Sequence, residues 1–268
     1  MKQISYLLCF FLGVLRVWSA PRCCSTLILV FLKASLHVTA LLEPLLINHN
    51  SDQADLLTAA VVQPKIDSLN AEVDSELRVS FGIIIKEHAW PYLFFMRTKS
   101  VFNRVTPFTF ANIAIVREPT VAMMSYVRLC QREGERMRPN EVSFGGLFSL
   151  WELLGDELII IDADDLIQNP VEIFELLCQR LEIQDRNAAV RWSSKDMKFK
   201  NLSRKLFAQW FRSVFRSTGF DQRFLSWNQF DPNWSCPDAM EETLAYNQNV
   251  YPVIWRNRLG SSMIETRV

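Results

Sequence analysis

Short apolar runs alternate along the chain with longer helical patterns. Four runs have the near-continuous apolar character of strands buried in a parallel sheet, and they cover residues 13–19, 78–86, 111–117 and 158–162. Periodic segments predict helices over about 27–36, 120–133 and 170–183, with further helical segments within 50–76 and near 200–216. This alternation predicts an α/β fold, a three-layer sandwich in which helices cover both faces of a central, mainly parallel sheet.

Composition places the chain among ordinary globular proteins. Of its 268 residues, 49% are hydrophobic and 22% are charged, which excludes collagen-like and low-complexity chains. No linker marks a boundary, so we predict a single domain over 1–268, with a core over about 14–220 and a helical and aromatic extension over 221–268. The 29 basic and 29 acidic side chains cancel, so any anion site is local and no nucleic-acid partner is expected.

The first twenty residues allow two interpretations. A basic start, an apolar run over 4–15 and Ser19-Ala20 imitate a secretory signal peptide, although Arg16 and Pro21 do not suit a cleavage site. The apolar run is too short to span a bilayer comfortably, so no stable membrane span is predicted. The alternative is a buried strand over 13–19 that leads into a turn and a helix. The residues alone leave both interpretations open.

The cysteines and histidines form no recognisable metal motif. There are six cysteines and three histidines, without a CxxC pair among them. Adjacent Cys23 and Cys24 cannot easily pair with each other. We therefore expect no metal site, and mostly reduced thiols in a cytoplasmic protein.

Parallel sheets bind ligands beyond the carboxyl ends of their strands, so the residues that follow each predicted strand are site candidates. After the first strand come Arg22, Ser25 and Thr26, at the start of a predicted helix. The N–H groups and dipole of a helix N-terminus suit a phosphate, whereas Ser25 and Thr26 could also simply cap the helix. The Walker A pattern is absent, which disfavours an ATPase or kinase.

The other strand ends also carry polar groups. Lys86 and His88 stand two residues apart and so point to the same side of an extended chain, and a histidine there can take a proton from a hydroxyl. Arg117 precedes Ser125 by eight residues, across a turn into a helix, and both can reach one anion. The acidic residues within 162–165 are expected to cap the next turn and to pair with arginines. Each group alone also has a purely structural interpretation.

Together these segments resemble the P-loop sulfotransferases that use 3′-phosphoadenosine-5′-phosphosulfate (PAPS). Residues 15–31 resemble the family's 5′-phosphosulfate loop, residues 85–88 its Lys-x-His motif, and Arg117 with Ser125 its 3′-phosphate pair. Residues 158–170 resemble its strand and acidic turn, and residues 215–220 a Ser-Thr-Gly-Phe segment of a bacterial-type subgroup. The resemblance covers about 14–220 and implies the sulfotransferase version of the P-loop NTPase fold.

The resemblance implies transfer of a sulfuryl group from PAPS to a hydroxyl or amine of a small-molecule, glycan or lipid acceptor, without a metal. It implies that His88 is the base and that Lys86 and Arg22 balance charge on the bridging oxygen. The residues that it implies for donor binding are Arg22, Cys23, Cys24, Ser25, Thr26, Arg117 and Ser125. Glu43 is a candidate for contact with the acceptor, and a structural turn is the alternative there.

One segment departs from the family pattern, and some alternatives remain open. Cys23-Cys24 replaces the usual Ser-Gly, and cysteine is costly at position 24 if the backbone there needs a positive φ. An inactive relative and a kinase-like nucleotide-binding protein remain alternatives. The resemblance favours the buried strand over the signal peptide, because cleavage after Ala20 would remove that strand. A cytoplasmic location is therefore expected, with an N-terminal anchor or secretion as alternatives.

Overall fold

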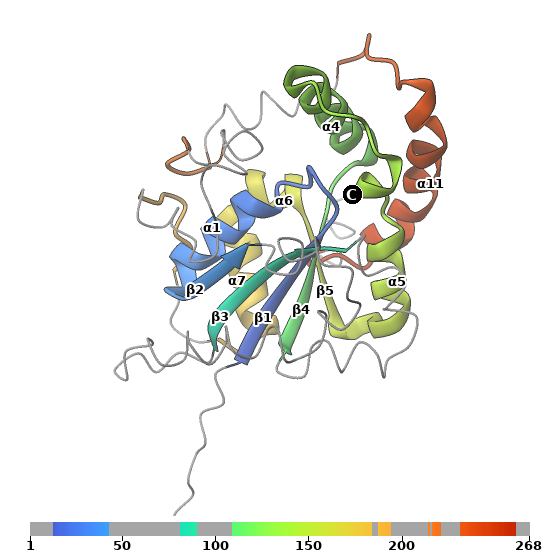
Figure 1. The fold of residues 1–268 in the computed structure, drawn as a ribbon. Helices are drawn as coiled ribbons and strands as arrows, with labels where there is room; N and C mark the ends of the chain where they lie inside the picture. Colours follow the sequence, from blue (N-terminus) through green and yellow to red (C-terminus); the bar gives the residue numbers. More distant parts are fainter. Residues whose placement is uncertain are drawn as a thin grey trace, which may run out of the picture.

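The centre of the molecule is a five-stranded sheet in the order β2-β3-β1-β4-β5 (Figure 1). The computed structural model describes residues 13–42, 81–89, 109–183, 187–193, 214, 216–220 and 231–260. All four strand pairings are parallel, which confirms the predicted α/β class. The strands are β1 (Gly13–Ser19), β2 (Thr39–Leu42), β3 (Phe81–His88), β4 (Thr109–Val116) and β5 (Leu158–Asp162).

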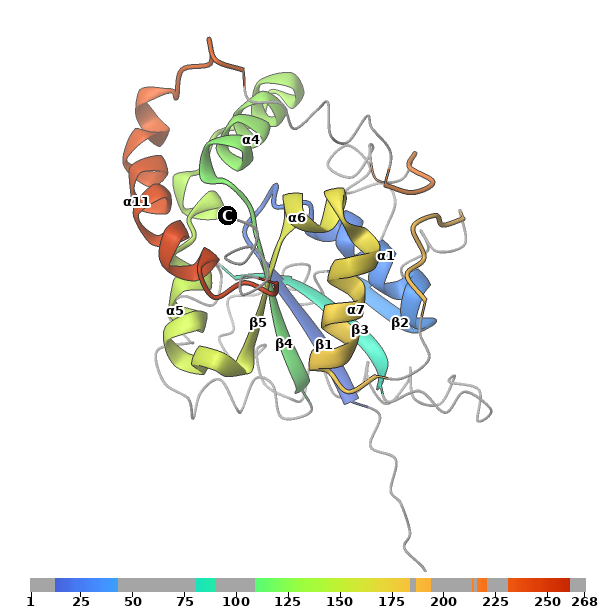
Figure 2. The same cartoon turned by 180° about the vertical axis from the view of Figure 1, so that it is seen from behind.

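Helices lie on both sides of this sheet. Helices α1, α6 and α7 lie together against one face, and α4, α5 and α11 gather on the other side, as the two opposite views show (Figures 1 and 2). Their bounds are α1 Ser25–Leu36, α4 Pro119–Glu133, α5 Gly145–Leu154, α6 Ala163–Gln168, α7 Pro170–Arg180 and α11 Asp238–Trp255; short 3₁₀ turns cover Pro139–Val142 and Gly155–Glu157. In the part of the chain that the structure describes, none of the helices is long and apolar enough to cross a lipid bilayer.

The apolar character of β1 follows from its place in the middle of the sheet. Leu15, Val17 and Trp18 are fully buried because helices cover both faces of this strand. On one face, Phe31 of α1 packs edge-on against Phe174 of α7, with ring centroids 5.5 Å apart. The core therefore holds β1 and α1 rigidly, and with them the turn that joins the two.

The strand register places the polar carboxyl ends of the strands next to one another at the same edge of the sheet. Ser19 of β1 lies opposite His88 of β3, and Val116 of β4 lies opposite Asp162 of β5. The chain crosses from β3 on one side of β1 to β4 on the other, and in such sheets ligands bind at the carboxyl ends of the strands on either side of this reversal. The residues that follow β1, β3, β4 and β5 are thus placed around one edge.

Some elements differ from those that the apolar pattern predicts. The predicted bounds of β1 and β5 are confirmed, whereas β3 and β4 begin and end one to three residues away from the predicted positions. The pattern did not predict β2, α5, α6 or α11. The buried residues of α11 are Met240, Asn247, Val250 and Ile254, and this stripe contains a polar residue in a helix that also contains Pro252. Predicted helical segments within 50–76 and near 200–216 lie outside the described residues, apart from Val214 and Arg216.

Candidate functional site

The β1–α1 turn has the geometry of an anion-binding loop. Arg22 and Cys24 both have left-handed backbone conformations, with φ values of 69° and 56°. A left-handed residue on each side of Cys23 curls the backbone in the manner of an anion-binding nest. Helix α1 begins at Ser25, and its N-cap Cys24 provides no side-chain capping bond. The positive end of α1 therefore faces the turn without a protein side chain to cap it.

Ser25 and Thr26 are buried in the first turn of α1 rather than at its N-cap position. The Ser19 hydroxyl donates a hydrogen bond of 2.8 Å to the Ser25 hydroxyl, which ties the end of β1 to the start of α1. The capping alternative for these two residues is therefore wrong, because the N-cap is Cys24. Ser19 itself was not a predicted site residue, although it is the last residue of the predicted first strand.

Cys24 carries the strain that the sequence comparison with Ser-Gly suggested. A residue with a Cβ pays about 1–2 kcal/mol for the left-handed conformation, which glycine adopts freely. Cys24→Gly is therefore expected to raise the free energy of unfolding by about 1 kcal/mol, measured by chemical denaturation. Cys23→Gly is the matched control: Cys23 is fully buried and lacks a positive φ, so this change should destabilise the protein. A loss of stability in Cys24→Gly as large as in Cys23→Gly would contradict the assignment of strain.

The predicted 5′ and 3′ phosphate residues come together at this turn. Arg22 Nε donates a hydrogen bond of 3.0 Å to Ser125 Oγ of α4, and Arg117 Nη1 donates one of 3.3 Å to the carbonyl oxygen of Arg22. Arg117 is only 2% exposed, and among the described residues its Nη2 has no hydrogen-bond partner. A buried guanidinium donor without a partner is costly, so this position fits an anionic ligand that supplies the missing acceptor.

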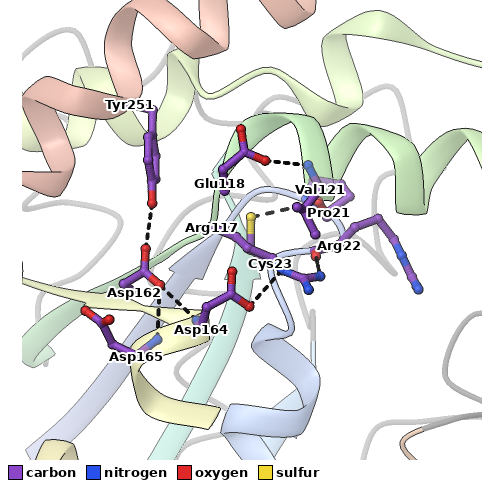
Figure 3. Close-up of polar contacts among 10 residues, drawn as sticks. All are labelled: Pro21, Arg22, Cys23, Arg117, Glu118, Val121, Asp162, Asp164, Asp165 and Tyr251. Atoms are coloured by element: carbon purple, nitrogen blue, oxygen red, sulfur yellow. Dashed lines mark hydrogen bonds and ion pairs between the residues drawn. The ribbon is translucent and has the colours of Figure 1, made fainter. Parts of the chain in front are cut away.

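The acidic turn after β5 caps a helix and pairs with arginine, as the sequence predicted. Asp162 is the N-cap of α6, and its Oδ1 accepts hydrogen bonds from the backbone N–H groups of Asp164 at 2.8 Å and Asp165 at 3.2 Å. Asp164 Oδ1 lies 3.4 Å from Arg117 Nε (Figure 3). Burial raises the pKa of Asp162, and a hydrogen bond from Tyr251 works in the opposite direction.

Lys86 and His88 point to the same side of β3, as their spacing predicted. Lys86 Nζ lies 3.2 Å from His88 Nε2, and the lysine side chain is only 1% exposed. The two groups lie within hydrogen-bond distance, with the roles of donor and acceptor set by the tautomer of the ring. The backbone N–H of Ala89 donates to the Ser19 carbonyl at 2.9 Å, so this end of β3 stays beside the β1–α1 turn.

Helix α5 packs tightly on the backbone that follows His88. A Cβ built on Gly146 would overlap the carbonyl group of Ala89. Gly146→Ala is therefore expected to destabilise the protein by about 2 kcal/mol, because a backbone group must move to admit the methyl. The measurement is a denaturation curve beside that of Gly134→Ala, where the added methyl meets open space and only the left-handed φ costs energy. Equal losses in both variants would contradict the proposed close packing.

Some residues at this edge play structural roles that the sequence did not disclose. The Glu118 carboxylate accepts hydrogen bonds from the N–H groups of Thr120 and Val121 and so caps α4, which begins at Pro119. In the segment that resembles Ser-Thr-Gly-Phe, Phe220 packs edge-on against Phe31 of α1 at 5.0 Å between ring centroids. This segment therefore packs against α1. Glu43 lies outside the described residues.

The described cysteines are free thiols: Cys23, Cys24, Cys130, Cys178 and Cys236. Burial raises the pKa of the Cys23 thiol, which keeps it protonated at neutral pH. Across the described ranges, no cluster of three or more His, Cys, Asp or Glu side chains has the arrangement of a metal site.

A family model described as a sulfotransferase domain matches residues 15–231. The chain belongs to the sulfotransferase domain family. This membership supports sulfuryl transfer as the chemistry of the site at the strand ends. The match ends before α11, so the C-terminal helix of this sulfotransferase lies outside the family model.

The chain is also similar to solved structures. The sulfotransferase domain from the curacin biosynthetic pathway is 14% identical, has a TM-score of 0.54, and the alignment covers 89% of this chain and 97% of that domain. The sulfotransferase domain of the Synechococcus PCC 7002 olefin synthase is 14% identical with a TM-score of 0.49, over 87% of this chain and 93% of that one. The first of these supports a shared fold. Comparison with curated protein sequences gave no significant match.

Proposed function

We propose that this sulfotransferase uses PAPS as its sulfuryl donor and a hydroxyl or amine of a small molecule, glycan or lipid as its acceptor. The observation that carries the proposal is the buried Arg117, whose Nη2 has no hydrogen-bond partner among the described residues and whose Nη1 donates to the backbone of the β1–α1 turn. Together with Arg22 and Ser125, this arginine supports a second anion position beside the helix N-terminus.

Two anion positions fit a nucleotide that carries phosphate groups on both the 5′ and the 3′ oxygen of its ribose. The N-terminus of α1, without a side-chain cap, suits the 5′-phosphosulfate, because backbone N–H groups and the helix dipole favour negative charge there. Arg117 and Ser125 suit the 3′-phosphate, which ATP lacks. Arginine is well adapted to this task, since its planar group donates several hydrogen bonds to one phosphate.

In the proposed reaction, the acceptor hydroxyl gives its proton to His88 Nε2 as its oxygen bonds to sulfur. The bond between sulfur and the bridging oxygen of the 5′-phosphate breaks, and 3′-phosphoadenosine-5′-phosphate leaves with that electron pair. In this proposal the charge that grows on the bridging oxygen is balanced by Lys86, which lies 3.2 Å from Nε2, and by Arg22 of the turn. Catalysis of this kind rests on positioning and on electrostatic stabilisation of the transition state.

A transfer assay tests the proposed function. PAPS with a radiolabelled sulfuryl group is incubated with the protein and a panel of phenol, sugar, lipid-alcohol and amine acceptors. We expect acceptor-dependent appearance of label in at least one product with the unaltered protein. Label that leaves the donor at the same rate with every acceptor and without any acceptor would contradict sulfuryl transfer and indicate simple hydrolysis.

A further inference from the structure

A chain of polar contacts leads from the C-terminal helix to the predicted donor site (Figure 3). Tyr251 of α11 donates a hydrogen bond of 2.7 Å from its hydroxyl to Asp162 Oδ2. The other oxygen of the same carboxylate accepts from the backbone N–H of Asp164, and the Asp164 carboxylate lies 3.4 Å from Arg117 Nε. Three contacts thus connect a residue beyond the family match with the arginine proposed to recognise the 3′-phosphate.

Asp162 is the central group of this chain. It is buried at the end of β5, and both of its carboxylate oxygens have partners, one from α11 and one from α6. A buried carboxylate needs such donors, because the loss of hydration would otherwise favour its neutral form. The Tyr251 hydroxyl therefore fixes the direction of the carboxylate, and the carboxylate fixes the backbone from which Asp164 projects.

Arg117 has few ways to move when these contacts are present. Its Nη1 donates to the Arg22 carbonyl and its Nε faces Asp164, so two edges of the planar guanidinium group are held. Nη2, at the remaining corner, has no partner among the described residues, whereas Nε has the ion pair with Asp164 but no hydrogen bond. Because the group is flat and rigid, holding two of its nitrogens sets the direction of the third.

The segment that follows α11 contacts the same acidic turn a second time. Arg258 Nε lies 2.9 Å from Asp165 Oδ2, and its guanidinium group lies 3.3 Å from the centre of the Trp255 ring. The N–H of Leu259 donates to the Ile160 carbonyl of β5 at 2.7 Å. The acidic turn is therefore held from the C-terminal segment at Asp162 and at Asp165.

We propose that α11 is a working part of the donor site, with Tyr251 as a positioning residue that acts through Asp162 and Asp164 to aim Arg117 at the 3′-phosphate. This inference rests on the proposed function, because it concerns recognition of the 3′-phosphate. Tyr251 touches neither the donor nor the acceptor in this scheme. Its removal should weaken only the part of donor binding that depends on the 3′-phosphate.

The test compares adenosine 3′,5′-bisphosphate with adenosine 5′-phosphate, which differs only by the absent 3′-phosphate. Their dissociation constants are measured by calorimetry for the unaltered protein and for Tyr251→Phe. The dissociation constant of adenosine 5′-phosphate divided by that of the bisphosphate should fall about three- to tenfold in Tyr251→Phe. Binding of adenosine 5′-phosphate should be nearly unchanged. Tyr246→Phe is the matched control, since Tyr246 lies on the same helix with 41% of its surface exposed. It should keep the full ratio.

A double-mutant cycle separates positioning from general stabilisation of the fold. In an Arg117→Ala background, Tyr251→Phe should have no further effect on the ratio, because the residue through which it acts is gone. A full ratio in Tyr251→Phe, or an equal effect with and without Arg117, would overturn the role of Tyr251. If Tyr251→Phe fails to fold, Asp164→Asn replaces it, because the Asp164 carboxylate is the last group of the chain before Arg117. A full ratio in that variant overturns the inference.

The same data distinguish the failure of the inference from the failure of the proposed function. If the unaltered protein binds both nucleotides equally, 3′-phosphate recognition itself is wrong, and the role of Tyr251 falls with it. If the unaltered protein prefers the bisphosphate and Tyr251→Phe does so equally, the proposed function stands and only the positioning role is wrong.

Discussion

His88→Ala is expected to slow sulfuryl transfer by about 10²–10⁴-fold and to leave binding of adenosine 3′,5′-bisphosphate unchanged. The reason is the position of the imidazole at the end of β3, opposite Ser19 in β1, with its Nε2 3.2 Å from Lys86 Nζ. In the proposed reaction this side chain accepts the acceptor's proton. Initial rates of transfer, together with calorimetry of the bisphosphate, measure the two effects separately.

His37 provides the control for this experiment. It lies exposed at the C-cap of α1 with φ 55°, at the end of that helix away from the β1–α1 turn. His37→Asn removes an imidazole and keeps a residue that tolerates the left-handed conformation, so it should preserve the rate. A rate that is equal in His88→Ala and in the unaltered protein would show that His88 is not the base.

Arg117→Ala is expected to weaken binding of adenosine 3′,5′-bisphosphate by about 100-fold and binding of adenosine 5′-phosphate much less. One or two hydrogen bonds between a buried guanidinium group and a phosphate are worth about 1.5–3 kcal/mol each, and about 2.7 kcal/mol corresponds to 100-fold. Arg117→Lys should recover part of the loss, since the charge returns without the planar set of donors. Calorimetric titration of both nucleotides measures the effect.

A surface arginine shows whether the effect is specific. Arg128 lies on the same helix as Ser125, its side chain is 48% exposed, and it pairs with the half-exposed Asp231 at 2.9 Å. Arg128→Ala should bind both nucleotides like the unaltered protein, because an exposed ion pair contributes little. A loss that is similar for the two nucleotides in Arg117→Ala would contradict a specific role at the 3′-phosphate and indicate general damage to the fold.

The sequence predicts the sheet well because its strands are buried on both faces. Such strands read as continuous apolar runs, as in residues 13–19 and 158–162, and these are the bounds of β1 and β5. Helix α11 escapes prediction for the opposite reason. Its buried stripe includes Asn247, which bridges to the Phe144 N–H and the Val142 carbonyl, and a polar residue of this kind interrupts the apolar period.

The site is predictable where it lies directly after a strand. Arg22, His88 and Arg117 stand at strand ends in the sequence, and the parallel register alone brings such residues to one edge. The contact of Tyr251 with Asp162 joins residues 89 positions apart, and no local pattern predicts such a pair. The left-handed backbone at Cys24 was foreseen only through the resemblance to a loop that has glycine there.

The most direct test of the account is calorimetric titration of the unaltered protein with adenosine 3′,5′-bisphosphate and with ATP. The buried Arg117 beside the β1–α1 turn predicts a sub-millimolar dissociation constant for the bisphosphate, roughly tenfold or more below that for ATP. Equal or tighter binding of ATP would contradict the account, because the site would then lack selectivity for the 3′-phosphate.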